Sequence, residues 1–282
     1  LGRPLNRISA PVFVGLDIGS SRTKVAVIDA DRQVLGHAVR KSGTDFSATA
    51  SACLDESLEM AGSRRDGIVN AISTGYGRTN VAFVTARSKT EIGCLSRWGR
   101  HHFSEAITII DIGGQDNKVI KLDQDGRRAS FKMNRKCAAG TGAFLEEMSL
   151  RLDIPLEAMD ALARQSLEMV KLGSYCTVFS ATEVLENIRH GKKVPDIVKG
   201  LFYSVVKRVL EMDSHAGRVV MTGGVVAHNP YIVEMAGEMA GRPVVLPEFP
   251  QLAGAIGAAL YALDETDPIG IPNDIPAGET NG

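Results

Sequence analysis

The apolar residues of this chain gather in short runs, and two of these runs end in the same way. Residues 12–16 and 107–110 are largely apolar, and each run is followed by an aspartate, an isoleucine and a glycine. A short apolar run that stops at a glycine turn is typical of a buried β-strand. A second run rich in valine and isoleucine follows the turn in both places. The pattern predicts two strand–turn–strand units, each with an Asp-Ile-Gly motif at its turn.

These two units repeat each other in register. When Asp17 is aligned with Asp111, residues 17–29 match residues 111–123, with the same residue at the glycine, the lysine, a valine and the last aspartate. Glycine lets backbone N–H groups approach an oxyanion, and a carboxylate at a strand end can hold a cation. One such unit alone does not indicate a nucleotide site, because an ordinary β-hairpin has the same pattern. Two copies in register favour two similar half-molecules that face each other across a nucleotide.

The rest of the chain alternates between predicted strands and helices, which is typical of an α/β fold. Further strands are expected at residues 34–39, 68–73, 219–222 and 244–246, and helices at 47–61, 144–152, 156–172, 180–191, 196–212 and 251–260, with another ending near 239. Residues 91–98 are less regular. Residues 74–78 (TGYGR) form a glycine-rich turn of unknown purpose, which a tight turn alone would explain.

The four cysteines fall into two classes. Cys53 and Cys94 are expected to be packed core thiols, whereas Cys137 and Cys176 each lie close to a predicted helix start. A helix N-terminus carries partial positive charge and free N–H groups, which favour a thiolate. The spacing of Cys137 and Cys176 matches neither a zinc ribbon nor a CxxC-type cluster motif. From spacing alone, two unrelated buried thiols remain an equal alternative.

Composition excludes several classes of function. The chain has 282 residues, 44% hydrophobic content and a net charge of −1, so we expect neither a nucleic-acid partner nor a membrane partner. No apolar run approaches the roughly 18 residues of a membrane span, and no secretory leader is recognisable, so the cytoplasm is the expected compartment. We expect residues 1–10 to be a disordered leader and residues 265–282, rich in proline and glycine, a flexible tail.

The repeated turns, the later strand–Gly–Gly at residues 219–224 and the small-residue helix near the C-terminus resemble the ATP-binding superfamily of actin, hexokinase and the heat-shock chaperones. This resemblance implies an α/β fold of two duplicated actin-like (ribonuclease H-like) halves, with ATP in the cleft between them. The first half would span residues 11–104. The second would span residues 105–264, with the cluster cysteines and a returning C-terminal helix.

A narrower resemblance rests on residues 111–116 (DIGGQD), 137–142 (CAAGTG) and 176–179 (CTVF). Together they resemble the ATP-dependent activators of 2-hydroxyacyl-CoA dehydratases and the ATP-binding subunits of benzoyl-CoA reductase. This implies that Cys137 and Cys176 from each of two subunits hold one 4Fe–4S cluster. The subunits would form a homodimer or a heterodimer with a related chain. Reduced ferredoxin or flavodoxin would supply the electron, and ATP hydrolysis would drive it into an iron–sulfur reductase or dehydratase.

Within this resemblance the site residues receive roles. Asp17 and Asp111 would hold Mg²⁺, and Gln115 or Asp116 would orient the attacking water. The backbone of a glycine pair would lie under adenine, and Thr141 would sense the γ-phosphate. The residues expected to contact the nucleotide are Gly19, Ser20, Ser21, Lys24, Gly113, Gly114, Gln115, Thr141, Gly223 and Gly224.

Two other functions remain as alternatives. A small-molecule kinase of the same superfamily would need a substrate pocket and a catalytic base, and it would leave the cysteines unexplained. An actin-like scaffold ATPase would leave them unexplained too. Within the favoured family, the motifs do not distinguish a separable activator from a permanent reductase component, and the overall look of the sequence slightly favours the permanent component.

Overall fold

The computed structural model describes residues 11–173 and 176–266, and the chain packs as two compact units. Unit 1 comprises the described residues of Leu1–Arg97 and Gly254–Gly282, and unit 2 comprises those of Trp98–Ala253. The sequence places the boundary at residues 104 and 105, whereas packing divides the chain within a helix. The expected leader lies outside the described residues, as does the expected tail beyond residue 266.

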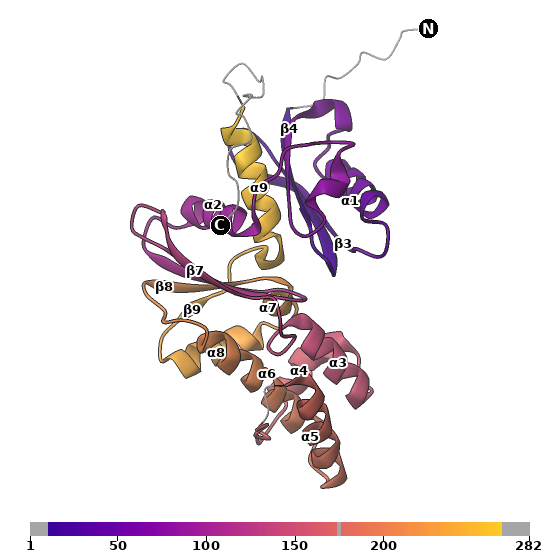
Figure 1. Ribbon diagram of the computed structural model, residues 1–282, viewed down its shortest axis with the longest axis vertical. Coiled ribbons are helices and arrows are strands. Elements are labelled where there is room, and N and C mark those ends of the chain that lie inside the picture. Colours follow the sequence, from indigo (N-terminus) through magenta and orange to yellow (C-terminus); the bar gives the residue numbers. More distant parts are fainter. Residues whose placement is uncertain (1–10, 174–175, 267–282) are drawn as a thin grey trace. The chain divides into compact units, whose positions relative to one another are not determined.

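Unit 1 is built on a four-stranded sheet in the order β3-β2-β1-β4. Its strands are β1 (Val12–Ile18), β2 (Arg22–Ile28), β3 (Val34–Lys41) and β4 (Ile68–Thr74). The first three form an antiparallel meander, and β4 is parallel to β1. Helices α1 (Phe46–Met60) and α9 (Ala253–Asp264) lie on opposite sides of this sheet (Figure 1).

The C-terminal helix α9 belongs to unit 1 because small residues let it approach other backbone closely. A Cβ atom added at Gly15 of β1 would lie 1.9 Å from the carbonyl oxygen of Ala255. One added at Gly257 would lie 1.9 Å from the carbonyl oxygen of Cys94 in α2 (Glu91–His102). At the end of α9, Asp264 accepts hydrogen bonds from the Arg97 guanidinium. Glycines at these contacts therefore let α9 pack closely against β1 and α2.

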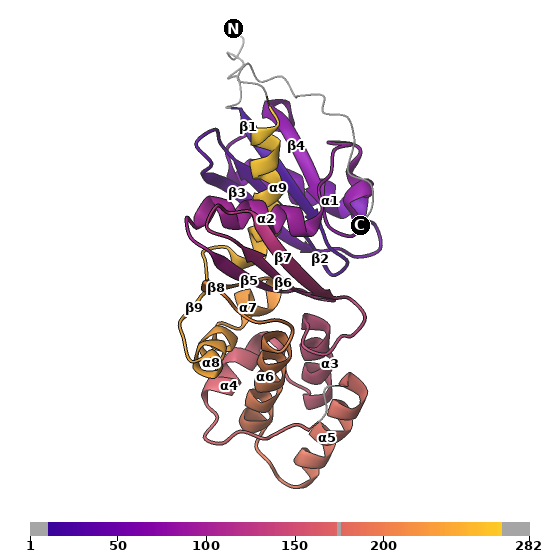
Figure 2. The same cartoon turned by 60° about the vertical axis from the view of Figure 1, so that its left-hand side comes forward.

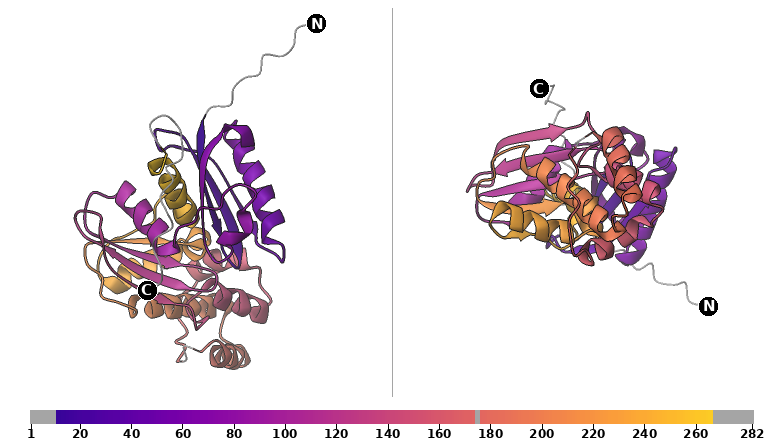
Figure 3. Two further views of the ribbon diagram at one scale, coloured as in Figure 1. Left: turned by 45° about the horizontal axis from the view of Figure 1, so that its top comes forward. Right: turned by 90° about the horizontal axis from the view of Figure 1, so that it is seen from below.

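Unit 2 repeats the sheet and extends it, in the order β7-β6-β5-β8-β9. Its strands are β5 (Ile107–Ile112), β6 (Asn117–Leu122), β7 (Arg128–Asn134), β8 (Arg218–Thr222) and β9 (Val244–Val245). Its helices are α3 (Gly142–Leu152), α4 (Met159–Arg164), α5 (Thr177–Arg189), α6 (Val194–Leu210), α7 (Gly224–His228) and α8 (Tyr231–Ala240). Helices α3 to α6 and α8 gather on one side of this sheet (Figure 2 and Figure 3).

The predicted strands are all present, but four helical regions differ from expectation. Residues 91–98, which look less regular in sequence, form most of α2; Thr90 Oγ1 accepts the N–H of Gly93 at its start. The predicted helix at 156–172 is short, because the buried Asp196 carboxylate accepts hydrogen bonds from Ser166 Oγ and Glu168 N and holds this segment out of helical geometry.

The other two differences concern helix boundaries. Helix α5 begins at Thr177 rather than at the predicted capping box, because Ser180 N already donates to Cys176 O at 2.8 Å. The helix expected to end near residue 239 is broken into α7 and α8 at Asn229 and Pro230. Proline has no N–H to continue the helical hydrogen bonding. Among the described helices, none is long and apolar enough to cross a membrane.

Candidate functional site

The turn between β1 and β2, here called turn 1 (residues 17–24), presents a carboxylate beside an ammonium. Asp17 and Lys24 are direct partners in the antiparallel ladder, and Lys24 Nζ lies 3.0 Å from Asp17 Oδ2. Gly19 N donates to Arg22 O, and a Cβ at Gly19 would lie 2.8 Å from that oxygen, so the turn requires glycine. The hydroxyl of Ser42 donates to Gly19 O at 2.6 Å and fixes the turn.

Ser20 and Ser21 form the tip of turn 1. Ser20 is exposed and Ser21 is half-buried, so the tip is open to a ligand within unit 1. Beside it, a Cβ at Gly254, next to the first residue of α9, would lie 3.1 Å from Asp17 Oδ2. The start of this long helix therefore lies against the carboxylate of turn 1, and the sequence gives no sign of that proximity.

The corresponding turn of unit 2, here called turn 2 (residues 111–118), has the same backbone hydrogen bond but carries one more carboxylate. Gly113 N donates to Asp116 O at 2.9 Å, as Gly19 does to Arg22. Lys118 Nζ lies 2.8 Å from Asp116 Oδ1 and 3.4 Å from Asp111 Oδ2. Gln115 is exposed, while Gly113 and Gly114 are half-buried. Two carboxylates beside an exposed amide are oxygen donors of the kind that Mg²⁺ prefers.

Turn 2 is hydrogen-bonded directly to the segment that carries Cys137. The carbonyl oxygens of Gly113 and Gly114 accept the N–H groups of Gly142 and Ala143, the first residues of α3, at 2.9 and 2.8 Å. Asn117, at the end of the turn, donates from Nδ2 to Gly140 O at 2.9 Å. Three hydrogen bonds therefore tie the start of α3 and the residue pair before it to turn 2.

The loop before α3 holds the remaining residues expected here. Asn134 at the end of β7 donates from Nδ2 to Cys137 O at 3.0 Å. Thr141, the expected γ-phosphate sensor, is fully buried, and its hydroxyl donates to Ala138 O at 2.6 Å. Cys137 itself is partly exposed. The backbone around Cys137 is thus held from β7 on one side and from turn 2 on the other.

A further part of the repeat is visible only in the structure. Thr74 is the ladder partner of Asp17, and Thr222 is the ladder partner of Asp111. Each threonine is followed by a glycine with positive φ, 91° at Gly75 and 100° at Gly223. A Cβ at these glycines would lie 2.5 Å from Ile18 O and 2.3 Å from Ile112 O, respectively.

The glycine-rich turn at residues 74–78 is therefore the counterpart in unit 1 of the Gly223–Gly224 element. In unit 2 the Thr222 hydroxyl also donates to Asp111 Oδ1 at 2.8 Å. In the sequence, the two segments share only a Thr-Gly pair after a strand, and such a short motif does not reveal the correspondence by itself. Gly223 N donates to Pro250 O at 2.9 Å, which ties this element to the chain just before α9.

The four cysteines divide as expected, with one pair in each unit. Cys53 and Cys94 in unit 1 are fully buried. Burial raises the pKa of the Cys94 thiol to about 12, and burial together with the nearby Glu56 carboxylate does the same for Cys53. Cys137 and Cys176 in unit 2 are partly exposed and exposed, respectively, and Cys176 is the N-cap residue of α5.

Within the described residues, no group of three or more His, Cys, Asp or Glu side chains is arranged to hold a metal ion. One copy of the chain therefore offers at most the two accessible thiols. The two residues after Thr177, Val178 and Phe179, are 71% and 64% exposed. Two exposed apolar side chains therefore follow Cys176 closely in the sequence.

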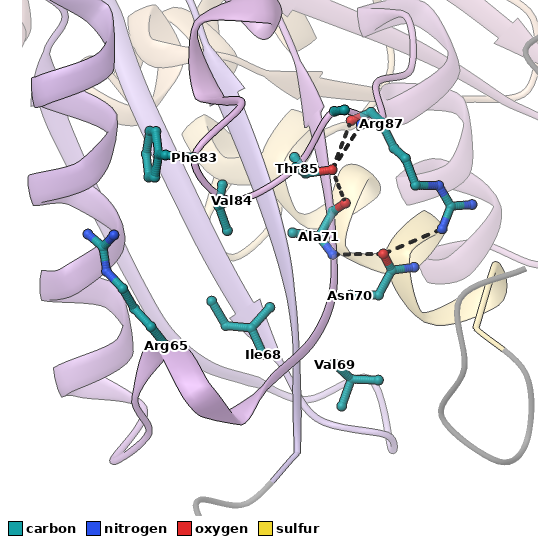
Figure 4. Close-up of a pocket in the computed structure, with 10 residues that line it drawn as sticks. Arg65, Ile68, Val69, Asn70, Ala71, Phe83, Val84, Thr85 and Arg87 are labelled. Atoms are coloured by element: carbon teal, nitrogen blue, oxygen red, sulfur yellow. Dashed lines mark hydrogen bonds between the residues drawn. The ribbon is translucent and has the colours of Figure 1, made fainter. Parts of the chain in front are cut away.

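A pocket of about 400 Å³ lies elsewhere in unit 1, beside the start of β4 (Figure 4). Its two arginines are already paired, Arg65 with Asp55 and Arg87 with Asn70 and Glu265. None of the predicted site residues lines it, and Thr74 and Gly75 lie at the opposite end of the strand. The pocket is therefore separate from the repeated turns.

Comparisons with known proteins agree with the geometry. The chain is 38% identical to the 2-hydroxyisocaproyl-CoA dehydratase activator of Clostridioides difficile, over 89% of this chain and 95% of the relative. It is 34% identical to the (R)-2-hydroxyglutaryl-CoA dehydratase activating ATPase of Acidaminococcus fermentans, over 88% and 96% of the two chains. It is 25% identical to one of the subunits of the benzoyl-CoA reductase of Thauera aromatica, over 89% and 92%.

The solved structures give the same answer. The activator of the 2-hydroxyisocaproyl-CoA dehydratase from Clostridium difficile, with bound ADPNP, has a TM-score of 0.84 at 37% identity, over 90% of this chain and 95% of that one. A ROK family glucokinase from Streptomyces griseus has a TM-score of 0.56 at 12% identity, over 90% and 99% of the two chains, which shows a shared fold alone. The predicted two-sheet, actin-like fold is confirmed. The BadF/BadG/BcrA/BcrD ATPase family matches residues 14–262, and the chain belongs to this family.

Proposed function

We propose that this chain is an ATP-dependent activator of a 2-hydroxyacyl-CoA dehydratase, which couples ATP hydrolysis to low-potential electron transfer. The observation that carries the proposal is the set of hydrogen bonds between turn 2 and the start of α3. Through these bonds, a ligand that moves Gly113 and Gly114 also moves Gly142 and Ala143, close to Cys137. The proposed nucleotide site and the position of the Cys137 thiol are thereby connected through backbone hydrogen bonds.

The thiols fit a shared iron–sulfur cluster. A 4Fe–4S cluster takes four thiolates and would supply one-electron transfer. This chain has two accessible thiols, Cys137 and Cys176, and two that burial keeps protonated. A two-fold dimer presents each surface twice, so two copies supply four ligands, as would this chain with a related subunit. The exposed Val178 and Phe179 next to Cys176 support a protein contact there.

The turns fit MgATP. Asp111 and Asp116 supply carboxylate oxygens for Mg²⁺, with Asp17 contributing from turn 1, and the exposed Gln115 can orient the attacking water. Backbone N–H groups at residues 19–21 and 113–115 would contact phosphate oxygens, Lys24 would pair with them, and Gly223 and Gly224 would lie under the adenine. Thr141 would act through the backbone of the Cys137 loop, since its hydroxyl is bonded to Ala138.

The partners follow from this role. We propose an iron–sulfur dehydratase as the electron acceptor and reduced ferredoxin or flavodoxin as the donor. The identity of 38% with a dehydratase activator, against 25% with a reductase component, favours a separable activator over a permanent component. This reverses the slight preference drawn from the sequence.

The test is a pair of cysteine variants prepared anaerobically. Cys137→Ser is expected to lose the absorbance near 400 nm and the bound iron, and with them all ATP-dependent reduction of the dehydratase. Cys53→Ala is the matched control, because that buried thiol is not a proposed ligand. If Cys137→Ser retained both iron and electron transfer, the ligand assignment would be wrong. Loss of iron in both variants would point to misfolding, which circular dichroism and ATP binding would detect.

A further inference from the structure

Lys118 is a buried ammonium held between the two carboxylates of turn 2. Its side chain is 5% exposed, and its Nζ lies within 3.4 Å of both Asp111 and Asp116. Lysine is almost never this buried unless it is paired. The other oxygen of Asp111, Oδ1, accepts the Thr222 hydroxyl. The ammonium therefore neutralises one of two carboxylates and leaves these three side chains with a net charge of −1.

Turn 1 has a lysine at the corresponding position, but its charged side chains have a net charge of the opposite sign. In the repeat, Lys24 corresponds to Lys118 and Asp17 to Asp111, whereas Arg22 stands where turn 2 has Asp116. Asp17, Arg22 and Lys24 together carry a net charge of +1. The two turns differ at four of eight aligned positions, but only the position of Arg22 and Asp116 changes charge, and it makes turn 1 cationic, which suits phosphate, and turn 2 anionic, which suits a metal ion.

We propose that Lys118 is a positioning residue that makes divalent-cation binding at turn 2 depend on the nucleotide. Its ammonium holds Asp111 and Asp116 in place and repels a bare cation from them. The phosphates of a bound nucleotide add the negative charge that offsets this repulsion, so that the cation is retained only together with ATP. This inference rests on the proposed MgATP role of turn 2, and it adds the residue that prevents turn 2 from responding to metal alone.

The experiment measures Mn²⁺ binding to the nucleotide-free protein by electron paramagnetic resonance, so it requires no activity. Lys118→Met is expected to bind Mn²⁺ at least tenfold more tightly than the wild type, and Lys118→Arg, which keeps the charge, is expected to bind as weakly as the wild type. Lys121→Met is the matched control. Lys121 lies on the same strand, its removal changes the net charge equally, and its partner is Asp213, outside turn 2.

Three outcomes decide the matter. Tighter Mn²⁺ binding in Lys118→Met but not in Lys121→Met supports the proposal. Equal binding in folded wild type and Lys118→Met overturns it. If Lys118→Met does not fold, Lys118→Gln replaces it, because glutamine removes the charge but can still hydrogen-bond to a carboxylate; it should bind Mn²⁺ more tightly than the wild type, and an unchanged affinity would overturn the proposal. Loss of iron or of ATP hydrolysis would bear on the proposed function and leave these metal affinities unaffected.

Discussion

Turn 1 and turn 2 have the same backbone and different chemistry. In both, a strand ends at Asp-Ile-Gly, the glycine N–H closes the turn, and a lysine directly across the ladder pairs with the aspartate. Among the positions where the two turns differ, only one changes charge, Arg22 in unit 1 and Asp116 in unit 2, and it reverses the sign of the local charge. A duplicated fold can therefore keep its backbone geometry while a single side chain gives the two copies opposite local charge.

The units also differ in what surrounds each turn. The hydroxyl of Ser42 holds turn 1 at Gly19 O, whereas the N–H groups at the start of α3 hold turn 2 at Gly113 and Gly114. The segment from α3 to α6 enters unit 2 between β7 and β8 and carries both accessible cysteines. The cysteines of unit 1 are buried instead. Hydrogen bonds thus connect turn 2 to the segment that carries the accessible Cys137, whereas turn 1 is contacted by the buried Cys53, whose Sγ donates to Thr23 O at 3.8 Å.

The largest expected difference between the units is in thiol reactivity. In metal-free protein, Cys137 and Cys176 should be alkylated by iodoacetamide at least about 10³-fold faster than Cys53 and Cys94, because only the thiolate reacts. With a pKa of about 12, only about one buried thiol in ten thousand is ionised at pH 8. Since the raised pKa keeps these thiols protonated, their rates should keep rising about tenfold per pH unit up to pH 10.

Peptide mass spectrometry over a time course would measure these rates. Denatured protein is the control, because all four cysteines should then react alike. Rapid modification of Cys94 in folded protein would contradict the division of the cysteines between the two units.

A smaller difference is expected in catalysis. Asp111→Asn should lower kcat for ATP hydrolysis by about 10²-fold to 10³-fold, the range seen when a charge-stabilising group is removed from an active site. Asp17→Asn should lower it only about tenfold, because turn 1 carries the positive balance and contributes less to metal binding. Steady-state phosphate release would measure both. Equal losses would mean that Asp17 and Asp111 contribute equally to ATP hydrolysis.

The glycines of the Thr-Gly elements should behave alike in the two units. Gly223→Ala and Gly75→Ala should each lower the free energy of unfolding by about 2–4 kcal/mol, because the added Cβ meets backbone and the positive φ is unfavourable. Gly191→Ala and Gly43→Ala are matched controls with positive φ but open space, and should cost about 1 kcal/mol. Chemical denaturation would show whether the repeat constrains both units equally.

The smallest expected effect concerns the hydrogen bond that distinguishes turn 1. Ser42→Ala removes the donor to Gly19 O and should cost about 1 kcal/mol of stability, because a partly buried acceptor loses its partner. ATP affinity should fall by less than about tenfold. Isothermal calorimetry would measure the affinity, with the exposed Ser20→Ala as the control for a hydroxyl at the same turn. An unchanged stability would mean that water replaces the Ser42 hydroxyl.

The sequence by itself determined most of the strands, the register of the two turns and the division of the cysteines. These follow from local signals: apolar runs that stop at glycine, a repeat at constant spacing, and small-residue segments before helices. The Gly/Ala pattern of residues 251–260 also predicted a close-packed helix. Which unit that helix joins depended on contacts at Gly15 and Cys94, which are far away in sequence.

Only the tertiary structure decided the rest. Residues 165–172 keep a helical pattern, yet the carboxylate of Asp196 holds part of this segment in another conformation. The correspondence between Thr74-Gly75 and Thr222-Gly223 follows from the sheets, where each threonine is the ladder partner of the aspartate of its own turn. Lys118 is an ordinary lysine in the sequence, and its burial between Asp111 and Asp116 is a property of the ladder. The physical reason is the same in each case: long-range contacts decide the partners of polar groups, and local patterns decide only where strands and helices can form.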